Sequence, residues 1–156
     1  MVAAAHGRWI ASAKWDGTVW LWDVLTGQES AVLIGHVGRV AALAVAPDGT
    51  WLASAGDDRT IRIWEIPSGK TRHVLSGHTG LVATLAAAPD GTWLASGGWD
   101  KAVRIWSMPG GQCQAMMRLD NSADGMTWLD TTALAIGGTA GIYLFDFLTY
   151  PTQAER

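Results

Sequence analysis

The sequence predicts an all-β fold built from repeated four-stranded antiparallel sheets, and three observations lead to this. The 156 residues include 19 glycines and 10 tryptophans, a composition typical of short strands separated by tight turns. Apolar and polar residues alternate with a period of two in segments such as Thr60–Ile66, which is the pattern of a half-buried strand. A pattern of fixed markers also returns along the chain with one period, which indicates repeated structural units.

The repeat has a period of 42 residues and rests on three kinds of marker. The segment Ala46–Ser54 returns with identical residues as Ala88–Ser96. The dipeptide Gly35-His36 returns as Gly77-His78. In three units an aspartate stands six positions before a tryptophan: Asp16 and Trp22, Asp58 and Trp64, Asp100 and Trp106. Agreement among three independent markers makes coincidence a poor explanation.

Each period divides into four short strands joined by turn-forming residues. In the second unit the expected strands are Val40–Ala46, Trp51–Ala55, Thr60–Ile66 and Thr71–Ser76. Glycine, proline and aspartate in the intervening segments favour tight turns. Four strands repeating every ~40–45 residues are typical of the blade of a β-propeller.

These markers resemble those of the WD-repeat family: a Gly-His pair, an aspartate in a tight turn, and Trp-Asp at the end of the third strand. Only the first unit ends that strand with the literal Trp-Asp, at Trp22-Asp23, whereas the next two have Glu65 and Ser107 after the tryptophan. The sequence of the repeated segment Ala46–Ser54 also resembles that of bacterial propellers of the actinomycete type, which often follow a signalling ATPase or a kinase domain. The resemblance implies a rigid scaffold that binds other proteins.

We expect four approximate units, residues 1–34, 35–76, 77–118 and 119–150, and a C-terminal tail, 151–156. The last unit diverges, and no fourth strand is evident after Phe147. Closed propellers of this family usually have seven blades, and four blades leave two apolar faces without neighbours. We therefore expect either the C-terminal part of a larger propeller or completion of the ring by oligomerisation.

A histidine, a serine, an aspartate and a tryptophan recur in each full unit. The resemblance implies that they form a structural network, with histidine bonded to aspartate and serine linked to the indole N–H. A catalytic triad is a poor interpretation, since a catalytic site is made once. The expected members are Ser12, Asp16, Trp22, His36, Ser54, Asp58, Trp64, His78, Ser96, Asp100 and Trp106.

A partner-binding face is expected on loops that the blades hold in place. The position before each turn aspartate should lie at the rim of one face, and exposed tryptophan there is a candidate hot spot. The alternative is that these indoles only cover the adjacent blade. The candidates are Trp15, Val37, Arg39, Asp57, Thr79, Leu81 and Trp99.

Composition disfavours several other functions. The net charge of −3 gives no basic stripe for nucleic acid, and no apolar run reaches the ~20 residues of a membrane helix. The lone Cys113 cannot form an internal disulfide, and we expect a cytoplasmic protein. We expect no catalytic residue, metal or cofactor. Two alternatives stay open: a self-assembling half-propeller, and an enzyme with a site in the propeller channel, which the Ala/Val/Leu-rich inner strands disfavour.

Overall fold

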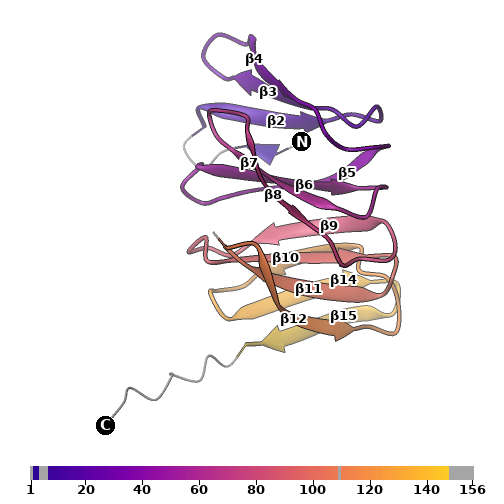
Figure 1. Cartoon of the computed structure of the whole chain (residues 1–156). Helices are drawn as coiled ribbons and strands as arrows, with labels where there is room; N and C mark the ends of the chain where they lie inside the picture. Colours follow the sequence, from indigo (N-terminus) through magenta and orange to yellow (C-terminus); the bar gives the residue numbers. More distant parts are fainter. Residues whose placement is uncertain (1, 4–6, 109, 148–156) are drawn as a thin grey trace.

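The computed structural model describes residues 2–3, 7–108 and 110–147 and consists of strands joined by turns and loops (Figure 1). Four antiparallel sheets follow one another along the chain, and we call them blades 1 to 4. Blade 1 holds β1 (Val2–Ala3), β2 (Trp9–Ala13), β3 (Val19–Asp23) and β4 (Glu29–Leu33). Blade 2 holds β5 (Val40–Val45), β6 (Trp51–Gly56), β7 (Ile61–Glu65) and β8 (Thr71–Leu75). Blade 3 holds β9 (Val82–Ala87), β10 (Trp93–Gly98), β11 (Ala102–Ser107) and β12 (Gln112–Arg118). Blade 4 holds β13 (Gly125–Trp128), β14 (Ala133–Gly138) and β15 (Gly141–Asp146).

The predicted all-β architecture of propeller blades is confirmed. Within each blade the strands pair in chain order, and each pair of neighbouring strands is antiparallel. Blade 4 has three strands among the described residues, and the expected tail, 151–156, lies outside them. None of the described segments forms a helix long and apolar enough to cross a membrane.

The turn between the first two strands has the same pair of hydrogen bonds in blades 2 and 3. In blade 2, Asp48 Oδ1 accepts hydrogen bonds from the Thr50 N–H at 3.0 Å and the Thr50 hydroxyl at 2.8 Å. Asp90 and Thr92 form the same pair in blade 3. Such an aspartate accepts the hydrogen bond that a backbone N–H would otherwise donate to a neighbouring strand. One strand therefore ends at this turn and the next begins after it.

The hydrophobic core lies between blades, not inside them. Each cluster of buried side chains combines residues of two successive sheets, and Trp51 of blade 2 belongs to the same cluster as Trp106 and Met108 of blade 3. Sheet-on-sheet packing of this kind follows from the alternation of side chains along each strand.

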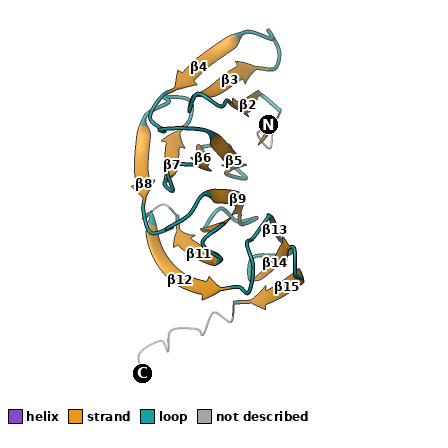
Figure 2. Ribbon diagram, turned by 90° about the vertical axis from the view of Figure 1, so that its right-hand side faces the viewer, coloured by secondary structure: helices purple, strands orange, loops and turns teal. Residues whose placement is uncertain are grey.

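The four blades form an open arc (Figure 2), with β4, β8 and β12 on its convex side. The strands β5, β9 and β13 are adjacent to one another on the opposite, inner side. Among the described residues, one face of blade 1 and one face of blade 4 have no neighbouring sheet.

Candidate functional site

A polar network with the expected members fixes one end of blades 2 and 3. In blade 3, His78 Nδ1 lies 2.9 Å from Asp100 Oδ2, and His78 Nε2 lies 2.8 Å from Ser96 Oγ. The Trp106 indole N–H donates to the same serine oxygen at 2.8 Å. Blade 2 repeats the network with His36, Asp58, Ser54 and Trp64, at distances of 2.7 to 2.8 Å.

The donors and acceptors of this network assign its protons. An indole N–H only donates and a carboxylate only accepts, so Ser96 Oγ accepts from Trp106 and Asp100 accepts from His78 Nδ1–H. The serine hydroxyl then donates to His78 Nε2, which requires a neutral imidazole. Burial lowers the pKa of His78 although Asp100 opposes the shift, and this agrees with the neutral form.

The turn aspartates are ionised in this arrangement. Burial raises the pKa of Asp100, but hydrogen bonds from the N–H groups of Thr79 and Ala102 and from His78 outweigh it, so the pKa is lowered. The same balance lowers the pKa of Asp58. Ser96 is fully buried and its oxygen accepts from an indole, so it is placed as a structural linker and not as a nucleophile.

Blade 1 holds only part of the network. Ser12 Oγ accepts from the Trp22 indole at 2.9 Å, as in the other blades. Asp16 is exposed and bonds to Thr18, through both the N–H and the hydroxyl, and these bonds lower its pKa. The structure does not bring Asp16 to a histidine, and His6 lies outside the described residues.

Two arginines belong to this end of the blades although sequence reasoning did not single them out. Arg104 donates to the Gly77 carbonyl oxygen at 2.8 Å and so ties the loop before the histidine to the third strand. Arg62 occupies the matching position of blade 2, with its guanidinium 5.9 Å from the Trp64 ring centroid. The sequence does contain a signal for these arginines, since they are 42 residues apart and each stands two positions before the repeated tryptophan.

The end of the arc that carries the turn aspartates is here called the upper face. Trp15, Val37 and Trp99 lie on it with 80%, 79% and 63% of their surfaces exposed. The alternative that the two indoles only cover an adjacent blade does not fit such exposure. Burial of apolar side chains is favourable, so large exposed ones at the same end of the blades indicate a contact surface.

On the upper face, Arg39 links blade 1 to blade 2. Its guanidinium carbon lies 5.0 Å from the Trp15 ring centroid, a cation–π distance. Arg39 Nε lies 3.7 Å from Asp57 Oδ1, and its backbone N–H donates to Asp57 Oδ2 at 3.3 Å. Trp15, Arg39 and Asp57 thus form one cluster across two blades, which we call the Trp15 cluster.

Trp99 forms a second group within blade 3. Its backbone N–H donates to the Leu81 carbonyl oxygen at 2.9 Å, and Leu81 is half-buried beside it. The Thr79 N–H donates to Asp100 Oδ2 at 2.9 Å, as the Val37 N–H does to Asp58 in blade 2. The same aspartates that complete the buried network therefore fix the loops of the upper face.

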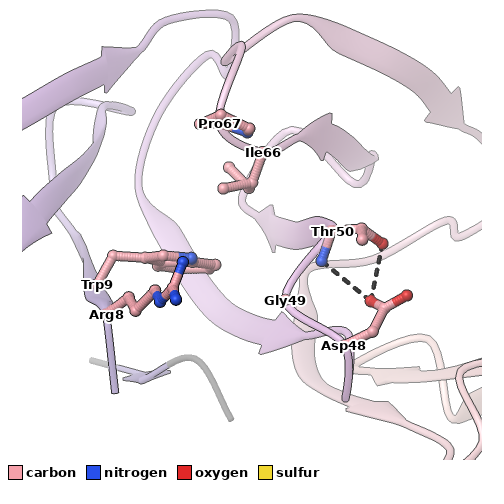
Figure 3. A pocket seen from close by; sticks show the side chains of 7 residues that line it. All are labelled: Arg8, Trp9, Asp48, Gly49, Thr50, Ile66 and Pro67. Carbon is pink, nitrogen blue, oxygen red and sulfur yellow. Dashed lines mark hydrogen bonds between the residues drawn. The ribbon is translucent and has the colours of Figure 1, made fainter. Parts of the chain in front are cut away.

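A cleft of about 720 Å³ opens at the other end of blades 1 and 2 (Figure 3). Arg8 and Trp9 of blade 1 face Ile66 and Pro67 of blade 2 across it, and Asp48 to Thr50 close one side. Its acid, Asp48, is already bonded to Thr50, as the dashed lines in Figure 3 show. The cleft offers an indole face and one guanidinium.

The described residues contain no group of three or more histidine, cysteine or acidic side chains arranged to hold a metal ion. The inner strands β5, β9 and β13 carry no acidic, histidine or cysteine side chain.

A comparison with protein families gives an independent match. The model described as WD domain, G-beta repeat, matches residues 2–23, 27–65 and 69–107. The first segment covers β1 to β3, whereas the second and third each begin with the last strand of the preceding blade, β4 or β8, and continue through the first three strands of the next blade. The match ends at Ser107, before β12 of blade 3.

Proposed function

Because the chain belongs to the WD-repeat family, whose domains typically act as non-catalytic scaffolds, we propose that it binds a protein or peptide on the upper face. Domains of this family generally mediate protein–protein interaction. The observation that carries the proposal for this chain is the exposure of Trp15 and Trp99 on turns that hydrogen bonds hold in place.

The Trp15 cluster has the properties of a binding hot spot. The indole is 80% exposed, yet Arg39 contacts it and Asp57 holds Arg39, so the cluster loses little freedom on binding. Tryptophan and arginine are the residue types enriched where interfaces gain most of their free energy. Together with Trp99, the cluster offers apolar surface beside paired charges, which suits a peptide with apolar side chains and a polar backbone.

Selection from a random peptide library on the immobilised full chain tests this proposal. The selected peptides are then titrated against the wild type and against a Trp15→Ala/Trp99→Ala double variant. We expect binding at least about tenfold weaker in the double variant, the effect of losing one hot-spot contact.

Leu25→Ala is the matched control, since Leu25 is 90% exposed in the turn after β3, away from the upper face. It should bind the selected peptides as the wild type does. Equal affinity in the double variant, or failure to select any peptide, would remove the upper face as the binding site.

We further propose that the chain works in the cytoplasm as the binding part of a larger signalling protein. The free, exposed Cys113 suits a reducing compartment. An enzyme with a channel site is the competing function, and a screen with broad hydrolase substrates separates the two: turnover by the pure chain would favour the enzyme.

A further inference from the structure

The apolar face of blade 4 repeats a surface that the next blade covers elsewhere in the arc. In blades 1 to 3 the third strand presents two apolar side chains toward the following blade, and each pairs across the ladder with alanine or glycine. These pairs are Val19 and Leu21, Ile61 and Ile63, Val103 and Ile105, all between 0% and 3% exposed. The matching pair of blade 4, Ile142 and Leu144, stands opposite Gly137 and Ala135 in the same register. It is 79% and 70% exposed.

The first blade carries the other half of the same junction. Each covering blade contributes a tryptophan of its third strand, paired across the ladder with an apolar residue of its second strand. These are Leu52 with Trp64 and Leu94 with Trp106, all buried in the clusters between blades. In blade 1 the matching pair is Ile10 and Trp22, which the open face leaves only half-buried.

Blade 1 differs from blades 2 and 3 in a way that adds apolar surface at this face. Trp20 stands where those blades have Arg62 and Arg104, and its ring stacks on Trp22 with the centroids 5.7 Å apart. The Lys14 ammonium lies 3.4 Å from the Trp20 ring centroid and adds a positive charge there. Residues 119–147, around the open face of blade 4, hold four aspartates and no lysine or arginine.

We propose that two copies of this chain associate head to tail, so that the blade 4 face of each copy covers the blade 1 face of the other. The contact continues the interfaces already present inside the arc, with Ile142 and Leu144 against Ile10 and Trp22. The two surfaces differ, so the contact is heterologous, and two such contacts close a pair of arcs into one ring. This interaction uses the flat faces of the end blades and does not depend on the upper face.

Sedimentation equilibrium of the full chain measures the association. We expect a dimer of twice the 16.6 kDa chain mass. Ile142→Glu and Ile10→Glu each place a charge in one half of the contact, and each should weaken dimerisation at least about tenfold. Far-UV circular dichroism shows whether the variants keep their sheets, and Ile142→Ser serves if Ile142→Glu fails to fold. Leu25→Glu, in neither face, should remain a dimer.

Mixing the two variants distinguishes the proposed contact from a symmetric one. Each variant retains one intact half, so an equal mixture should form a heterodimer through that one contact and should associate more tightly than either variant alone. A monomeric wild type, or a mixture that stays monomeric, would overturn the proposal. A wild type that forms open-ended filaments would overturn the closed pair.

Discussion

Replacing the buried serine of blade 3 tests the role of the polar network most directly. Ser96→Ala removes the oxygen that accepts from the Trp106 indole at 2.8 Å and the hydroxyl that meets His78 Nε2 at 2.8 Å. Both remaining groups are buried, and each unsatisfied group costs about 1–3 kcal/mol. Because the small gap left by the hydroxyl allows some relaxation, we expect a loss of about 2–4 kcal/mol in the free energy of unfolding.

Ser12→Ala is the matched control, since it removes the same hydroxyl from blade 1. There the serine accepts a hydrogen bond from the Trp22 indole, and both side chains are half-buried. We expect a loss of about 0.5–1 kcal/mol, the typical value of a single hydrogen bond. Urea unfolding followed by circular dichroism and tryptophan fluorescence gives both values, and two probes are needed because repeat units can unfold separately. A cost for Ser96→Ala no larger than that for Ser12→Ala would refute the argument that the histidine makes the network more costly to break.

Three further predictions concern His78 and the turn before the third strand of a blade. The pKa of His78 is lowered in the folded state, so the unfolded chain takes up a proton first as the pH falls below the ordinary histidine pKa of 6.5, and stability is lost there. Urea unfolding at a series of pH values should show the stability advantage of the wild type over His78→Gln shrinking below pH 6.5, and an advantage that stays constant would contradict this. Arg59 has a positive φ of 65°, so Arg59→Gly should raise the melting temperature through a gain of about 0.5–1 kcal/mol. Gly17→Ala at the matching position should lower it, because the new Cβ would lie 2.7 Å from the His36 carbonyl oxygen, and a neutral result would show that the loop can move.

The period of the sequence was sufficient to predict the blades because the physics of a strand is local. Alternation and turn residues fix where a strand begins and ends, and the expected strand Trp51–Ala55 differs from β6 by one residue. The bonds of His78 and Ser96 came from the resemblance, because spacing alone does not show which side chains of different strands meet.

The contacts across blades could not be predicted in this way. The approach of Arg39 to Trp15 depends on how one sheet packs on the next. The sequence of the unit that holds either residue does not predict this contact. The stack of Trp20 on Trp22 was open to prediction only by asking where blade 1 departs from its own repeat. Differences between blades at equivalent positions therefore say more about such contacts than the strand pattern of a single blade does.

The repeat separates the residues that hold the blades from those that can vary. Asp58 and Asp100 are fixed, since each bonds a histidine, a backbone N–H of the preceding loop and a backbone N–H of its own turn. The position before each aspartate makes its backbone bond to that loop whatever its side chain, as Asp57 and Trp99 both do. This backbone bond therefore lets the side chain at this position vary: the Asp57 carboxylate holds Arg39, whereas the Trp99 indole is 63% exposed. This is why the upper face can hold exposed tryptophans without a cost to the fold.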